Sequence, residues 1–438
     1  MKLAHFTLIL SILLTIQAQA QKMSLEQCMA YAVENNANVR IQSWNNDSNR
    51  ADKAAAIASL APSISANTQV TESFGRSIDP ETNIYTTNAN IGNSYSLTAQ
   101  MPIFQGLRGI NNIRLARFAE LAGESKLQQQ KDETAIAVMK AYYKVVYYAK
   151  CADICREQIE TSTRTLEETR KRKELGLKSD ADVAQVASKL ASDELELTRQ
   201  SNLMQTSLIE LKNAMNYPID EALEIETELA KEGIWLHESN LDEDFALSIN
   251  PKMIASTNDM QQSFMQLKIE RGKVAPSISM FGGYNTNYYR ALDNAASVAP
   301  FWTQLQNNQG AYFGAQLSIP IFTGLSRYSG IRKAKNNYRI AQEQNAAVER
   351  EIRGEIARNE MELQGYEKEY EQAERKVEAA QLASDASIAR FNQGLVSAVD
   401  MQTTANDLMN AKAARLNAAL QYEICARISD YYNGKKLY

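Results

Sequence analysis

Two aspartates occupy equivalent positions in this chain of 438 residues: Asp182 lies three residues after Ser179, and Asp400 lies three residues after Ser397. The chemistry open to such residues is electrostatic. In a Ser-x-x-Asp pattern, each side chain accepts a hydrogen bond from the backbone N–H of the other residue, and this caps the start of a helix. The carboxylate also lies at the positive end of the helix dipole. We therefore predict that both pairs cap helices.

Residue constellations of enzymes are missing from the sequence. His237 is the single histidine after the first twenty residues, and no second metal ligand stands at a fitting spacing from it. The sequence contains no phosphate-binding loop, nucleophile elbow or zinc motif. We expect a protein that is not an enzyme, with no catalytic residue, cofactor or metal site.

A short segment with a glycine precedes each serine. Both segments have the same residues at the same spacing: Arg172, Gly176, Leu177 and Ser179 in the first, and Arg390, Gly394, Leu395 and Ser397 in the second. Glycine at the end of a helix favours a positive φ, and serine favours the first position of the next helix. The arginines can complement the negative end of the helix dipole. We predict two helical hairpins, with an apolar leucine at each exposed turn.

These segments belong to an internal repeat. Pro102-Ile103-Phe104 recurs as Pro320-Ile321-Phe322, an offset of 218 residues that also relates Gly176 to Gly394. Ala61–Ser65 recurs as Ala275–Ser279 at an offset of 214 residues. A constant offset over a long segment predicts a rigid rod, and the change of offset predicts a surface loop.

The repeat divides the chain. Lys2, a short apolar stretch and Ala18-Gln19-Ala20 are typical of an export signal with its cleavage site. We expect four regions: a signal peptide at 1–20, a first repeat at 21–218, an inter-repeat segment at 219–243 and a second repeat at 244–438.

Hydrophobic periodicity predicts the same elements in both repeats. Each begins with a helix, from Ser24 to Leu60 and from about Asp244 to Val274. Alternating residues then predict a strand pair, with loops at 75–93 and about 289–309. Long helical hairpins follow, and Leu190, Leu197, Met204 and Leu211 have the seven-residue spacing of a coiled-coil seam. The strand pairs are expected at 62–102 and 276–320, and the hairpins at 108–216 and 326–433.

The expected strands are about ten residues long, which suits tilted transmembrane strands. Their second face carries Ser, Asn, Gln and Thr, which favours a wet lumen, although a soluble sheet is also possible. Four strands cannot close a barrel, and an open edge in lipid leaves backbone groups unsatisfied. Two copies would supply eight strands, whose side chains fill the interior, and three would supply twelve, which leave room for a lumen.

The net charge bears on possible binding partners, and the cysteine content bears on disulfides. The formal net charge is −5, which argues against nucleic acid. The four cysteines are too few for a disulfide scaffold in a chain of this length. Cys28 and Cys425 could form a disulfide, or all four could be buried free thiols.

Taken in order, these motifs resemble the TolC family of outer-membrane efflux proteins over essentially the whole chain after the signal. The resemblance rests on Ser24-Leu25-Glu26-Gln27, both Ala-Pro-Ser strands, both Pro-Ile-Phe-x-Gly-Leu turns and both hairpin motifs. It implies a mainly α fold with transmembrane β: a homotrimer whose twelve-stranded outer-membrane β-barrel continues into a periplasmic α-helical barrel. The segment 219–243 would be equatorial. An inner-membrane pump and a periplasmic adaptor would be partners, and the cargo a drug, a metal ion or a protein.

The resemblance also implies roles for single residues. Asp182 would take part in contacts of a closed periplasmic gate, and Asp400 would lie in an acidic ring. Thr403 stands where a second acid of that ring would fall, which implies a weaker ring. Arg172 and Arg390 resemble adaptor-docking arginines, with Gly176, Leu177, Ser179, Gly394, Leu395 and Ser397 completing the docking tips. The alternative is a soluble periplasmic coiled-coil scaffold or adaptor, with an ordinary sheet.

Overall fold

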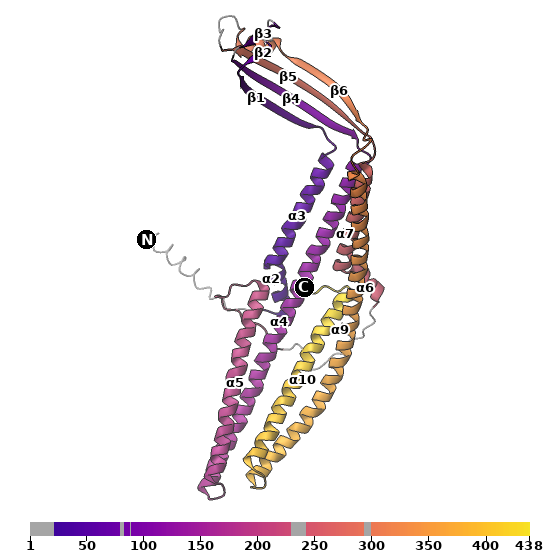
Figure 1. The fold of residues 1–438 in the computed structure, drawn as a ribbon. Coiled ribbons are helices and arrows are strands. Elements are labelled where there is room, and N and C mark those ends of the chain that lie inside the picture. The colour runs from indigo at the N-terminus through magenta and orange to yellow at the C-terminus, as the bar shows by residue number, and fades with distance from the viewer. Residues whose placement is uncertain (1–21, 79–82, 88, 229–241, 293–298) are drawn as a thin grey trace, which may run out of the picture. The chain divides into compact units, whose positions relative to one another are not determined.

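The computed structural model describes residues 22–78, 83–87, 89–228, 242–292 and 299–438 (Figure 1). The expected signal peptide and His237 lie outside these residues. The chain divides into two compact units. The helical unit comprises Ser125–Ile254, Ala347–Tyr438 and the chain up to Trp44, and the sheet unit comprises Asn45–Glu124 and Ala255–Ala346. Each unit therefore contains parts of both sequence repeats.

The sheet unit is built on four antiparallel strands in the order β1-β4-β5-β6. Their bounds are Ser63–Ser73 for β1, Asn90–Phe104 for β4, Ser277–Ala291 for β5 and Gly310–Ser318 for β6. Strand β4 pairs with β5, so the expected strand pairs of the two repeats join in one sheet. Each Gly-Leu that follows the sheet, Gly106-Leu107 and Gly324-Leu325, has positive φ at both residues.

The expected loops at 75–93 and 289–309 are partly wrong. Strands β4 and β5 extend together to Asn90 and Ala291, because cross-strand pairing continues beyond the alternating segment. A small sheet of β2 (Arg76–Ile78) and β3 (Tyr85–Thr87) forms in the first expected loop. The short helix α8 (Phe301–Asn307) forms in the second, and Gln304 holds it to the backbone of Tyr289 in β5.

Both faces of the four-stranded sheet leave apolar and polar side chains accessible. Every residue of β1 is exposed, and so are Phe313 and Leu317 of β6. In the part of the chain that the structure describes, β1 and β6 are the two edges of this sheet. The sheet therefore does not bury an apolar face beneath the helices of its own unit.

The helices α4 (Arg108–Glu174), α5 (Asp180–Met215), α9 (Ser326–Asn392) and α10 (Ala398–Tyr432) form the two expected hairpins (Figure 1). None of the helices in the described residues has the combined length and apolarity of a membrane span. The main core of the helical unit unites α2, α4, α5 and α10. It includes Cys28, Met29, Val138, Met139, Leu211, Met215 and Leu420.

The single helix expected at the start of each repeat is wrong, because each is broken at an asparagine. The first consists of α2 (Leu25–Asn35) and α3 (Ala37–Ala58), and the second of α6 (Glu243–Ile249) and α7 (Pro251–Gly272). Asn36 and Asn250 have extended ψ angles of 133° and 121°. Their side-chain oxygens accept hydrogen bonds from the backbone of Asn38 at 2.8 Å and Lys252 at 2.9 Å. Each asparagine thus ends one helix and caps the next.

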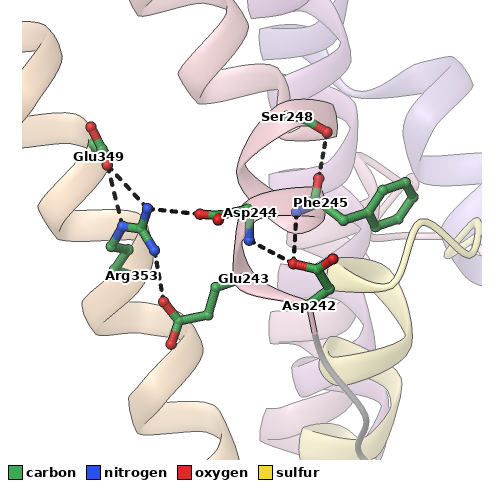
Figure 2. A network of polar contacts seen from close by, with 7 residues as sticks. All are labelled: Asp242, Glu243, Asp244, Phe245, Ser248, Glu349 and Arg353. Atoms are coloured by element: carbon green, nitrogen blue, oxygen red, sulfur yellow. Dashed lines mark hydrogen bonds and ion pairs between the residues drawn. The ribbon is translucent and has the colours of Figure 1, made fainter.

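Two arginines hold the short helices α2 and α6 in place within the helical unit. Arg353 of α9 binds Glu243 at 2.8 Å and Asp244 at 3.0 Å, both in α6 (Figure 2). These hydrogen bonds, together with two to Glu349, raise the pKa of Arg353. Arg427 of α10 binds Glu26 of α2 at 3.1 Å. The first helix of each repeat is therefore held by an arginine of the second repeat.

All four cysteines are buried free thiols, so Cys28 and Cys425 do not pair. Burial raises the pKa of Cys28 to about 12 and that of Cys425 to about 11. Since the thiolate is the reactive form, we expect a charged maleimide to leave the native protein unmodified at mildly alkaline pH. In dodecyl sulfate without reductant it should modify all four cysteines, as counted by mass spectrometry. Two missing modifications in the unreduced, unfolded protein would contradict the structure.

Candidate functional site

The turns of both hairpins lie in the helical unit and have the geometry that their glycines predict. Gly176 and Gly394 have φ angles of +73° and +79°. The backbone N–H of Leu177 bonds to the Arg172 carbonyl at 2.9 Å, and Leu395 bonds to Arg390 in the same way at 2.9 Å. These are the bonds with which a left-handed residue satisfies the last carbonyls of a helix. Leu177 and Leu395 are both well exposed at the turns.

Both Ser-x-x-Asp pairs are reciprocal caps, as the sequence predicts. Ser179 Oγ accepts from the Asp182 backbone at 3.1 Å, and the Ser179 N–H donates to Asp182 at 2.9 Å. Ser397 and Asp400 repeat this arrangement at 3.1 Å and 3.2 Å. The hydrogen bonds from the backbone and side chain of Ser179 lower the pKa of Asp182. Capping therefore accounts for the two carboxylates by itself.

The two hairpin ends are joined, and their arginines are not equivalent. The Arg172 guanidinium donates to the carbonyl of Asn392 in the other hairpin. The Asn392 side chain in turn donates to Glu168 at 3.0 Å. Arg390 is exposed instead. In the sequence the two arginines are equivalent, and nothing in the repeat indicates which carbonyl lies beside each of them.

Phe391 anchors an apolar cluster between the hairpin ends. Its side chain is fully buried, and the Lys178 ammonium lies 3.6 Å from the centre of its ring. The other buried members of the cluster are Leu166, Val186, Ala398 and Met401. These residues come from α4, α5 and α10, so the cluster holds one hairpin against the other.

A buried ion pair lies deeper between the same hairpins. Lys189 and Asp193, one turn apart on α5, have only 4% and 3% of their surface exposed. Lys189 Nζ also donates to Asn406 of α10 at 2.8 Å. Ser162 Oγ of α4 donates to Asp193 at 2.6 Å. Three helices from both hairpins thus meet at two desolvated charges.

This ion pair was not predicted, although the sequence contains a signal for it. A coiled-coil heptad has two buried positions, the second of which can lie three residues after the first. Asp193 lies three residues after Leu190 of the seam. A carboxylate at such a position must find a partner, because burying an unpaired charge costs much free energy.

Thr403, the remaining candidate, is exposed on α10. Its hydroxyl donates to the Val399 carbonyl at 3.0 Å, one turn earlier in the same helix. Among the described residues, no group of three or more His, Cys, Asp or Glu side chains could hold a metal ion.

Comparison with known proteins agrees with this fold. Residues 30–217 and 244–426 match the family described as "Outer membrane efflux protein", so the chain belongs to that family. Residues 218–243 between these two segments are unmatched, and all but the first of them lie in the inter-repeat segment.

Individual relatives are distant in sequence. The outer membrane efflux protein BepC of Brucella suis biovar 1 (strain 1330) is 22% identical over 357 residues, which cover 80% of this chain and 73% of BepC. The fold is similar to that of the outer membrane protein VceC from Vibrio cholerae, with a TM-score of 0.77 and 16% identity over 92% of this chain and 95% of VceC. The fold is also similar to that of the Campylobacter jejuni CmeC outer membrane channel, with a TM-score of 0.78 and 16% identity over 93% of this chain and 84% of CmeC.

Family membership decides between the two classes of function left open by the sequence. The protein is an outer-membrane efflux channel that extends into the periplasm, as the resemblance implies. A soluble periplasmic scaffold or adaptor is not favoured.

Proposed function

We propose that three copies of this chain form one exit duct, which passively conducts cargo from the periplasm when an adaptor and an inner-membrane pump are docked. The observation that carries the proposal is the exposed four-stranded sheet with its two edges, β1 and β6. Backbone groups at such edges need partners in lipid. Three sheets of four strands give twelve, which enclose a lumen.

The hairpin tips are the proposed docking surface. Leu177 and Leu395 lie at turns that point into solvent and bury little against their own chain. Arg390 is exposed beside the second tip, whereas Arg172 already binds the neighbouring hairpin. Of the two arginines we therefore assign adaptor contact to Arg390, and we assign to Arg172 the fixing of the two tips at a constant spacing.

The proposed gate lies at the same ends. Asp182 and Asp400, in three copies each, would surround the periplasmic mouth, and Thr403 would leave the ring with fewer charges than a second acid would give. The caps hold both carboxylates at the starts of their helices, and the lowered pKa of Asp182 keeps that group charged. The reduced cation preference that we expect therefore follows from Thr403 and not from capping. Passive conduction needs no cofactor and no covalent chemistry, so we propose that the protein is not an enzyme.

The docking assignment is tested by placing aspartate at both tips, Leu177→Asp with Leu395→Asp. A charge at an apolar contact should abolish docking. Cells whose own channel gene is deleted and that express this variant should therefore be as sensitive to a panel of dyes, detergents and metal salts as deleted cells that express no channel. The amount of oligomer in the outer-membrane fraction should stay unchanged.

The matched control keeps the tips apolar, with Leu177→Met and Leu395→Met, and should export like the unmodified protein. Unimpaired resistance in the aspartate variant would overturn the docking assignment. Loss of the oligomer itself would show that the tips serve assembly rather than docking.

A further inference from the structure

The internal repeat maps one strand pair of the sheet onto another. The 214-residue offset carries β1 onto β5, and the 218-residue offset carries β4 onto β6. In the first pair, Ser63 lies opposite Gln100 and Thr71 opposite Gly92. The offsets convert these into Ser277 opposite Ser318 and Asn285 opposite Gly310. Both are the pairs found between β5 and β6. The repeat therefore reproduces strand register to the residue.

The remaining pair, β4 with β5, has no mapped equivalent within one chain. Its image under the same offsets would join β6 to a β1 strand, and in this chain those are the two edges. A second copy of the chain is the partner that supplies the missing strand. This inference rests on the proposed shared barrel and adds the register that closes it.

We propose that β6 of one copy pairs antiparallel with β1 of the next so that Gln316 lies opposite Gln69. This is the image of Thr98 opposite Gly283 in the β4–β5 pair. In the same way, Leu97 opposite Tyr284 maps to Ala315 opposite Val70. Each further pair as far as Pro320 opposite Ser65, the image of Pro102 opposite Ser279, follows by moving one residue along both strands in opposite directions.

Side-chain chemistry supports this register independently. It places polar Gln316 and Ser318 opposite polar Gln69 and Asn67, all on the face expected to line the lumen. On the other face, Ala315 and Ile319 lie opposite Val70 and Ala66. A slip of one residue would turn every side chain of one strand to the wrong face. A slip of two residues would leave every side chain on its own face, so the mapping from the repeat is the argument against it.

The second Pro-Ile-Phe motif fits the same seam. In β4 the first motif is paired through an irregularity, with Phe104 opposite Ile278. Ile103 and Phe104 are accordingly 50% and 41% exposed, whereas Ile321 and Phe322 of the second motif are 93% and 82% exposed. The mapping places Phe322 opposite Ile64 of the next copy, which is itself exposed. The seam thus covers the apolar residues that one chain leaves bare.

Cysteine pairs can test the register in the full-length protein in outer membranes. Directly opposite side chains have Cβ atoms about 4.5–5.5 Å apart, and diagonal neighbours about 7–8 Å, whereas disulfides need about 3.5–4.5 Å. The matched variant is Gln316→Cys with Gln69→Cys. The shifted variants combine Gln316→Cys with Asn67→Cys or with Thr71→Cys. Hydrogen-bonded and non-hydrogen-bonded pairs alternate along antiparallel strands, and their side chains differ in how close they lie. A second matched variant, Ala315→Cys with Val70→Cys, therefore tests the neighbouring pair, whose side chains lie on the other face.

After mild oxidation, non-reducing gels should show at least several-fold more covalent dimer and trimer for one or both matched pairs than for the shifted pairs. Each single-cysteine variant should remain monomeric on the gel. Leu97→Cys with Tyr284→Cys, opposite within one chain, is the positive control, detected as an intramolecular disulfide by mass spectrometry of digested protein. The native cysteines are buried and stay in place.

A shifted pair that crosslinks best would overturn the register while leaving the shared barrel intact. If no pair crosslinks although the control does, the seam is wrong. The size of the detergent-solubilised complex then separates the two ideas: three copies would uphold the proposed assembly, and a single copy would overturn it as well.

Discussion

Replacing Lys189 by methionine should destabilise the helical unit by about 3–5 kcal/mol, the usual cost of leaving one partner of a buried ion pair without the other. Among the described residues, Ser162 would be the one hydrogen-bond donor left to Asp193, which would remain almost inaccessible to water. The contact from Lys189 to Asn406 of α10 would also be lost. Guanidinium unfolding of the detergent-solubilised protein, followed by helical circular dichroism, measures the change.

The control for this prediction removes both charges. In Lys189→Met with Asp193→Leu no charge is left buried, so most of the lost stability should return. A single variant that is no less stable than the double variant would contradict the view that the pair is desolvated and mutually dependent.

Replacing Phe391 by alanine should have an effect of similar size, about 3–5 kcal/mol, because a fully buried ring leaves a cavity. The variant would also remove the ring beneath the Lys178 ammonium. Both losses weaken the contact between the two hairpins, so protease cleavage near their tips should become faster. The same unfolding measurement gives the free-energy change.

The repeat offers a matched control for Phe391. Its equivalent at an offset of 218 residues is Lys173, an exposed residue with an ion pair to Asp180. Lys173→Ala should change the free energy of unfolding by less than about 0.5–1 kcal/mol. Equal effects at the two positions would mean that the contact between the hairpins does not depend on the buried ring.

Local signals in the sequence were sufficient to predict the two helical hairpins. Gly176 and Gly394 require positive φ, and Ser179 and Ser397 pair with carboxylates three residues later, so turns and caps follow from neighbouring residues alone. The long helices begin and end close to the expected residues for the same reason.

Features that depend on distant partners could not be predicted in this way. Nothing near Arg172 in sequence indicates that it binds the carbonyl of Asn392. The lengths of β4 and β5 likewise depend on each other, since each strand continues as far as the other pairs with it. The helix breaks at Asn36 and Asn250 are different, because their signal is local: each side chain accepts from the backbone two residues later, asparagine favours caps over helix interiors, and proline follows Asn250.

The size of the complex extracted from outer membranes tests the central proposal most directly. Light scattering of the detergent-solubilised protein, corrected for bound detergent, should give three copies of the chain, because one sheet cannot satisfy its own edges in a membrane. A stable, membrane-embedded single copy would contradict the account.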